Sequence, residues 1–242
     1  LDFWRKNAKE NLANLHKSLQ ERHVRAGELA YLLEPDLKEA RGGLRDIQAL
    51  RAISLSAAIA VPLEKISWAE GTLNNVRESL HIASGRGKDR LLFQEQDKVA
   101  KLLNYPDADA MMSDVARAAR TVDYLLNYTW HALEHKEKDG LGRILKRPRI
   151  TTVAKNVSAS NREIVIDPFT SLNDDPVCGL RAAATAAQLG LPLSLDTCTE
   201  LSENLKSGQG KLPTPWPREA RELLISLIGA GEAMVGIFES LD

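Results

Sequence analysis

The longest regular feature of the sequence is a run of apolar residues at helical intervals between Asp107 and Lys138. Apolar residues three or four positions apart line one face of an α-helix, so the run predicts one long helix with a single buried stripe. Shorter runs with the same period surround it, and together they predict a mainly α fold, a helical bundle. The stripe consists of Met111, Val115, Ala118, Val122, Leu125, Leu126 and Leu133.

The shorter runs give four or five helices before residue 140. A double glycine, Gly42-Gly43, and Pro35 separate the first helix from the second, and the polar residues Arg45 and Gln48 fall on the face of the second helix opposite its apolar stripe. The expected helices cover about 3–33, 44–53 and 69–84, with another in "RLLFQEQDKVAKLLNY".

The composition of the sequence changes after Gly140. This change divides the chain into a helical region, 1–140, and a second region, 141–242, with a hairpin and a helical linker. Val, Ile and Thr become frequent around a polar Ser-Ala-Ser-Asn centre, and this pattern predicts one small β-hairpin near residues 150–166. Pro and Gly punctuate the return to helices, which we expect at about 177–189, 195–207 and 218–241.

Composition excludes some classes of function. Apolar residues make up 43% and charged residues 27% of the chain, and charge interrupts the long apolar runs, as in a globular protein that does not span a membrane. A net charge of -1 and a pI near 6.6 argue against binding to DNA or to an anionic membrane by bulk electrostatics. The expected partners therefore include no DNA and no membrane.

Two further observations concern the setting of the chain. Cys178 and Cys198 lack metal-ligand spacing, so we expect buried free thiols in a reducing cytoplasm. The chain starts "LDFWRKNAKENL", without an initiator Met or a secretory signal, and we expect it to be an excised fragment.

The stretch "LEPDLKEARGGLRDIQ", residues 33–48, has the ingredients of an anion site. Glycines let the backbone approach a ligand, a helix N-terminus presents free N–H groups, and Lys38, Arg41 and Arg45 supply positive charge. Spacing alone leaves two interpretations open, a phosphate loop or a plain helix entry with solvated cations. The order of a Walker loop is absent.

A second basic cluster, "GRGKDR", places Arg86, Lys88 and Arg90 around Asp89, which could equally be the N-cap of the following helix. His131 and His135 have the i, i+4 spacing of metal ligands, but a third ligand is not evident. No catalytic triad and no carboxylate pair of the kind that binds Mg²⁺ stands out in the sequence.

Two motifs in order point to a family. "YLLEPDLKEARGGLRDIQALRAI" and then "LHIASGRGKDRLLFQEQDKVAKLLNY" resemble the segment after the nucleotidyltransferase core of the PII uridylyltransferase/uridylyl-removing enzymes. The later "NREIVIDPFTSLNDDPVCGLRAAATAAQLGLPLS" is similar to the hairpin region of the same family, so the resemblance covers nearly the whole chain.

The resemblance implies a nucleotidyltransferase-associated helical domain and, after it, a linker to a metal-dependent HD domain and two ACT domains. It implies an enzyme that moves UMP from UTP to a tyrosine of the PII signalling protein with Mg²⁺, removes it by hydrolysis, and responds to glutamine through the ACT domains. The Mg²⁺ ligands and the HD motif are expected outside this chain, which is then inactive alone.

The resemblance also assigns roles to residues. Lys38, Arg45 and Arg90 are expected to face the nucleotide phosphates, while Gly42 and Gly43 allow the nucleotide to approach the backbone. Asp46 is expected either to hold Arg45 or Arg90 or to assist at the metal. Two alternatives stay open: a helical interaction or signal-relay module that docks PII or couples sensor and catalytic domains, and a regulatory nucleotidyltransferase like the glutamine synthetase adenylyltransferases.

Overall fold

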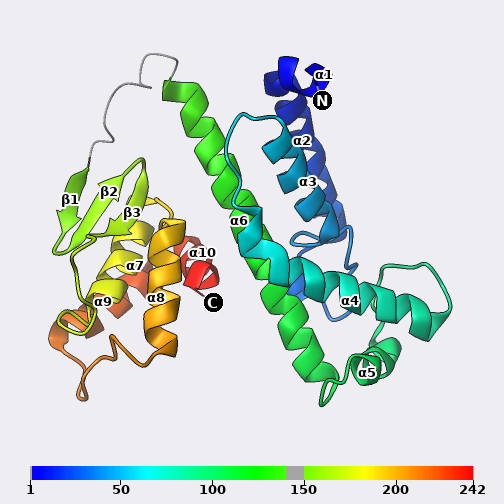
Figure 1. The fold of residues 1–242 in the computed structure, drawn as a ribbon. Helices are drawn as coiled ribbons and strands as arrows, with labels where there is room; N and C mark the ends of the chain where they lie inside the picture. Colours follow the sequence, from blue (N-terminus) through cyan, green and yellow to red (C-terminus); the bar gives the residue numbers. More distant parts are fainter. Residues whose placement is uncertain (1, 140–149, 242) are drawn as a thin grey trace. The chain divides into compact units, whose positions relative to one another are not determined.

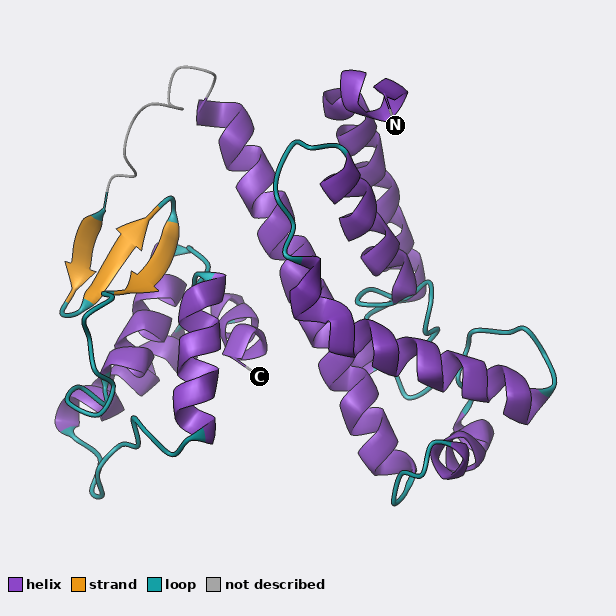
Figure 2. Ribbon diagram, viewed as in Figure 1, coloured by secondary structure: helices purple, strands orange, loops and turns teal. Residues whose placement is uncertain are grey.

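The computed structural model describes residues 2–139 and 150–241, with side chains described for all of these except 135–139. The chain divides into two compact units, Leu1–Gly140 and Leu141–Asp242. The fold is mainly α, which confirms the predicted class (Figures 1 and 2).

The first unit is built around one long helix. α6 (Ala108–Asp139) contacts α3 (Leu44–Leu55), α4 (Ser67–Ser84) and α5 (Phe93–Leu102) (Figure 1). Its apolar stripe is buried from Met111 to Leu133. The predicted stripe is therefore the core of this unit. The other elements are α1 (Asp2–Lys6), α2 (Ala8–Ala26), η1 (Leu29–Tyr31), α3 (Leu44–Leu55), η2 (Leu63–Ile66), α4 (Ser67–Ser84) and α5 (Phe93–Leu102).

The predicted first helix is wrong in its extent. It was expected to run over about 3–33, but α2 stops at Ala26 because Gly27 adopts a left-handed φ of 74°. The chain then turns so that Glu28 pairs with Arg41, and the backbone N–H of Arg41 donates to the carbonyl of Gly27 at 2.8 Å. This turn brings the double-glycine segment back against the end of α2.

The second unit pairs a small sheet with four helices (Figure 2). The sheet is antiparallel, with strand order β1-β2-β3, and Val157 pairs with Ile166 and Ala159 with Ile164. Val157, Ile164 and Ile166 are buried, and α7 and α8 contact the sheet. Its elements are β1 (Thr151–Ala154), β2 (Val157–Ser160), β3 (Glu163–Ile166), α7 (Cys178–Leu189), α8 (Leu195–Lys206), α9 (Arg218–Gly229) and α10 (Glu232–Leu241).

Two details of this unit differ from the predictions. The expected hairpin is a three-stranded meander, because the polar "VSAS" is itself a strand and Asn156, Asn161 and Arg162 take the left-handed conformations at its turns. The expected final helix, 218–241, is two helices bent by 117° with Gly231 at φ 61° between them. Within the described residues no single helix is long and apolar enough to cross a membrane, and only this bent pair meets the criteria of length and composition when taken together.

Candidate anion-binding site

The two motifs meet through backbone hydrogen bonds, although Asp36 and Arg90, the residues that pair, lie 54 positions apart in the sequence. The N–H of Leu37 donates to the carbonyl of Asp89 at 2.9 Å, and the N–H of Leu91 donates to the carbonyl of Pro35 at 2.8 Å. Asp36 and Arg90 thus form an isolated antiparallel bridge. We call this place, formed by 34–38 and 86–91 with the end of α4, the motif junction.

Asp89 is the centre of the motif junction. Its Oδ1 accepts hydrogen bonds from Arg77 Nε at 2.6 Å and from His81 Nε2 at 2.9 Å, and its Oδ2 lies 3.8 Å from Lys38 Nζ. Burial opposes its charge, but the hydrogen bonds from Arg77 and His81 and the nearby charges outweigh burial and lower the pKa of Asp89. Asp89 is not an N-cap, since α5 begins at Phe93 after Leu92.

The double glycine serves packing within the chain. Gly42 has φ +83°, and a Cβ at this position would lie 2.5 Å from the carbonyl oxygen of Ala119 in α6. A Cβ on Gly43 would lie 2.8 Å from the carbonyl oxygen of Ala40. The close approach that requires these glycines is therefore to α6 and to the preceding turn, and the expected approach of a nucleotide is not needed to explain them.

The backbone N–H groups at the start of α3 are already used. Gly42 N–H donates to Asp46 Oδ2 at 2.7 Å, and Gly43 N–H donates to the carbonyl of Ala40 at 2.9 Å. The N–H groups of Leu44 and Arg45 donate to the carbonyls of Leu37 and Lys38, both at 3.0 Å. An anion at this helix N-terminus would have to displace internal hydrogen bonds, so side chains are the groups left to hold one.

Asp46 occupies a place that differs from the expected one. It is fully buried and accepts hydrogen bonds from Arg22 and, at 3.0 Å, from His23 Nε2, both on α2. Burial alone would raise its pKa, but the hydrogen bond from His23, the charge of Arg22 and the Gly42 N–H together lower it. Asp46 therefore joins α2 to the double glycine and does not hold Arg45 or Arg90.

Arg45 and Lys38 have separate surroundings. Arg45 is exposed, donates from Nε to Glu39 Oε1 at 3.1 Å, and lines a groove of about 390 Å³ between α2 and α3 that Arg22 and Arg25 also line. Lys38 belongs to the motif junction with Arg90, whose guanidinium lies 3.3 Å from Glu34 Oε2. Of the predicted cations, Lys38 and Arg90 both belong to the motif junction, each beside a different carboxylate, whereas Arg45 lies in the groove.

Arg41, whose role the sequence left open, fastens the loop to α6. Its Nε donates to Asp123 Oδ1 at 2.7 Å, and its guanidinium lies 3.2 Å from Glu28 Oε1. Burial, the largest influence on Asp123, raises the pKa of this carboxyl despite the opposing effect of Arg41. Arg41 therefore acts within the fold.

The metal pair expected at His131 and His135 cannot be placed, because the side chain of His135 lies outside the described residues. Where side chains are described, no three His, Cys, Asp or Glu residues gather as metal ligands. The oxygens of Asp46 and Asp89 already accept hydrogen bonds or face cations, so neither carboxylate fits a Mg²⁺ ligand as it stands.

The sequence prediction missed four residues of these clusters. Arg77 and His81, one turn apart on α4, complete the motif junction, and their i, i+4 spacing next to a basic loop was the signal that could have drawn attention to them. Arg22 and His23, which hold Asp46, gave no such signal, because they lie among many charged residues of α2.

The fold and the motif junction define a helical protein with a locally cationic site between two motifs. The chain belongs to the GlnD PII-uridylyltransferase family, whose family model matches residues 10–66 and 61–130, and this confirms the family predicted from the two motifs. No solved structure matches the chain.

Named relatives agree with this assignment. The bifunctional uridylyltransferase/uridylyl-removing enzyme of Streptomyces coelicolor is 41% identical over 99% of this chain and 30% of its own length. The enzyme of the same name from Mycobacterium tuberculosis is 33% identical over 99% of this chain and 30% of its own length. The enzyme of the same name from Corynebacterium glutamicum is 29% identical over 91% of this chain and 31% of its own length. The chain spans about 30% of the length of these curated relatives.

Proposed function

We propose that this chain is part of an enzyme that transfers UMP from UTP to a tyrosine of the PII signalling protein and removes it hydrolytically. The observation that carries the proposal is the motif junction, where the two motifs shared with the family meet, with Lys38 beside Asp89 and Arg90 beside Glu34. Cations suit this role, because transfer from a nucleoside triphosphate requires that the negative charge of its phosphates be stabilised.

The chain's own part in this proposal is to position the nucleotide. Lys38 and Arg90 at the motif junction, and Arg45 from the exposed face of α3, bind and orient phosphate oxygens. Gly42, Gly43 and Asp46 act indirectly, because they fix the loop that carries Lys38 against α6 and α2. The proposal places Mg²⁺ on residues outside this chain, the site of action in the cytoplasm, and glutamine sensing on ACT domains.

The test uses the longer protein that contains this chain. In that protein, Lys38→Ala and Arg45→Ala should each lower the kcat/KM for UTP about tenfold or more, since each removes a charged hydrogen bond to phosphate. Lys98→Ala, which removes an exposed cation of α5 that is not part of the motif junction, is the matched control and should leave the rate unchanged. UTP with Mg²⁺ should also protect Lys38 from amine-reactive labelling.

Two results would favour the other candidates. If both substitutions leave transfer unchanged, UTP gives no protection and capture of PII weakens, the chain is an interaction or relay module. If the protein modifies its target with an adenylyl group from ATP and ignores UTP, it is a regulatory nucleotidyltransferase of the adenylyl type.

A further inference from the structure

Arg77 brings a guanidinium to the motif junction although it belongs to neither family motif. It lies on α4, and its Nε donates to Asp89 Oδ1 at 2.6 Å. Among the described residues, none accepts a hydrogen bond from the terminal N–H groups of Arg77. These groups are not buried either, because the only buried side-chain nitrogen or oxygen without a partner in the described part of the chain is Nε1 of Trp130. The terminal nitrogens of Arg77 therefore face solvent.

The motif junction also has a surplus of positive charge. The junction, taken as 34–38, 77–84 and 86–91, carries five cations against four carboxylates, and one of these carboxylates, Asp36, is engaged by the backbone N–H groups of Lys38 and Glu39 at 3.0 and 2.7 Å. Because the whole chain has a net charge of -1, this surplus is local. The cations are Lys38, Arg77, Arg86, Lys88 and Arg90, and the carboxylates are Glu34, Asp36, Glu78 and Asp89.

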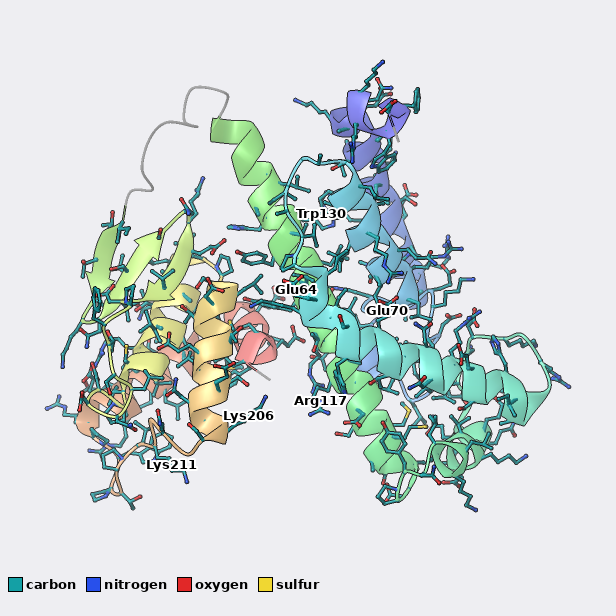
Figure 3. All side chains as sticks on the ribbon, viewed as in Figure 1. Glu64, Glu70, Arg117, Trp130, Lys206 and Lys211 are labelled. Atoms are coloured by element: carbon teal, nitrogen blue, oxygen red, sulfur yellow. The ribbon has the colours of Figure 1, made fainter. Side chains whose placement is uncertain are left out.

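Two exposed arginines elsewhere in the first unit, Arg51 and Arg117, have partners of their own. Arg51 pairs with Glu70 at 2.7 Å, and Arg117 pairs with Asp114 at 2.8 Å while its guanidinium lies 4.3 Å from the ring centre of Trp68 (Figure 3 labels Glu70 and Arg117). Each of these cations has a local partner on α4, α6 or a neighbouring helix. By contrast, three groups at the motif junction share the single carboxylate of Asp89.

We propose that Arg77 and Lys38 form a phosphate-binding pair and that Asp89 is the residue that positions them. Asp89 holds Arg77 by one oxygen and faces Lys38 with the other, while His81, one turn after Arg77 on α4, fixes the carboxylate. The free edge of a guanidinium fits two oxygens of one phosphate, and an ammonium adds a point charge beside it.

This inference rests on the proposed function and deepens it, since it names the residues that take the phosphates of UTP. It also makes a distinction that the family motifs do not. Arg77 touches the anion, whereas Asp89 acts through Arg77 and Lys38.

Binding to the 242-residue chain tests the pair directly. Titration of pyrophosphate and of UTP, without metal and at low salt, should show that Arg77→Ala weakens binding of both by about tenfold. Asp89→Asn should weaken it several-fold, and Asp89→Glu should restore part of the affinity. Lys98→Ala and Asp97→Asn, exposed changes of the same charge on α5, are the matched controls and should have no effect.

A spectroscopic signal separates contact from mere support. In the wild-type chain the Nε–H resonance of Arg77 should shift when pyrophosphate is added, and in Asp89→Asn the free and bound resonances should both move. If Asp89→Asn does not fold, as judged by circular dichroism, Arg77→Gln replaces it in the binding test, because this variant removes the positive charge and leaves the Asp89 carboxylate in the chain.

The outcomes distinguish this inference from the proposed function. If transfer in the longer protein depends on Lys38 but not on Arg77 or Asp89, and the Arg77 resonance stays fixed, the inference is overturned while the proposed function stands. If Arg77→Ala weakens pyrophosphate binding but transfer does not depend on Lys38 or Arg45, the phosphate pair stands and the proposed function fails.

Discussion

At the scale of single residues, Asp46 is the buried charge on which the double-glycine loop depends. Asp46→Asn can keep a hydrogen bond with Gly42 N–H but leaves the guanidinium of Arg22 buried without a counter-charge. Breaking a buried pair in this way costs about 3–5 kcal/mol. Urea unfolding should show a loss of this size.

The matched control for this change is Asp97→Asn, which alters the same group at an exposed position of α5. It should change the free energy of unfolding by less than about 0.5 kcal/mol. A similar small loss for Asp46→Asn would mean that the contact with Arg22 contributes nothing to stability.

The same carboxyl makes stability depend on acid. Because the folded pKa of Asp46 lies below its usual 3.8, its contribution is fully present above pH 3.8 and is lost as the pH falls through the folded pKa. The wild type should therefore lose more stability than Asp46→Asn between about pH 4 and pH 2. Equal acid dependence of the two proteins, measured by thermal unfolding, would contradict this assignment.

Gly42 and Gly87 give a second matched pair. Gly42→Ala forces a side chain into a left-handed conformation and against the carbonyl of Ala119, and should cost about 2–4 kcal/mol of unfolding free energy. Gly87→Ala has open space and an ordinary φ, and should be neutral or stabilise by up to about 1 kcal/mol. Equal effects of the two substitutions in urea unfolding would refute this account of the double glycine.

These residues also show where sequence reasoning stops. The pattern indicated that Gly42 needs a close approach, but a sequence does not say whether the neighbour is a ligand or a helix 77 positions away at Ala119. Asp46 was expected to hold Arg45 or Arg90 or to assist at the metal, and the structure buries it in the first turn of α3 instead. Its burial depends on the packing of α2 against the start of α3, and this tertiary contact cannot be read from the spacing of apolar residues.

At the scale of elements, Arg181 ties three pieces of the second unit together. From α7 it donates to Asp175 Oδ2 at 2.9 Å, to Glu219 of α9 at 2.7 Å and to the carbonyl of Lys155 between β1 and β2 at 3.0 Å. Burial, the largest influence, would raise the pKa of Asp175, but the hydrogen bonds and charge of Arg181, together with Asn156 and Lys155, lower it. This side chain is buried, so its removal leaves Asp175 without its main counter-charge.

Arg181→Met, which keeps most of the side-chain volume, should therefore lower the free energy of unfolding by about 2–4 kcal/mol. This loss is smaller than for a fully buried pair, because the carboxylates of Asp175 and Glu219 are partly exposed to solvent. Hydrogen exchange should increase in β1, β2 and the start of α9. The control Arg218→Met breaks an exposed pair with Glu222 and should change stability by less than about 1 kcal/mol.

Elements with long uninterrupted periods were the ones that the sequence predicted well. α4 and α6 lie within a few residues of their expected bounds, because a helix with a complete apolar stripe leaves little choice of structure. The breaks at Gly27 and Gly231 were missed, since an isolated glycine within a helical period is tolerated and does not by itself end a helix. The bridge between Asp36 and Arg90 could not be predicted from the sequence, because it joins segments that are separated by the helices α3 and α4.

At the scale of the whole molecule, the charges are balanced, and the positive surplus of the motif junction is a local one. The chain has 32 Lys and Arg residues against 33 Asp and Glu residues, so it lacks the broad positive field that holds proteins on nucleic acid. A small anion needs only a few convergent donors, whereas a duplex presents charge along its whole length. We therefore expect the chain to bind pyrophosphate but not duplex DNA at about 0.15 M salt.

A gel-shift titration with a short duplex, run beside the pyrophosphate titration, checks this expectation. Arg86→Ala with Lys88→Ala, which removes the two exposed cations of the loop before Asp89, provides the informative variant. If the wild type shifted the duplex, and this double variant abolished the shift while leaving pyrophosphate binding intact, the loop would be a nucleic-acid contact. The net charge of the whole chain would then not predict whether it binds DNA, because the cations of one exposed loop would be sufficient for binding.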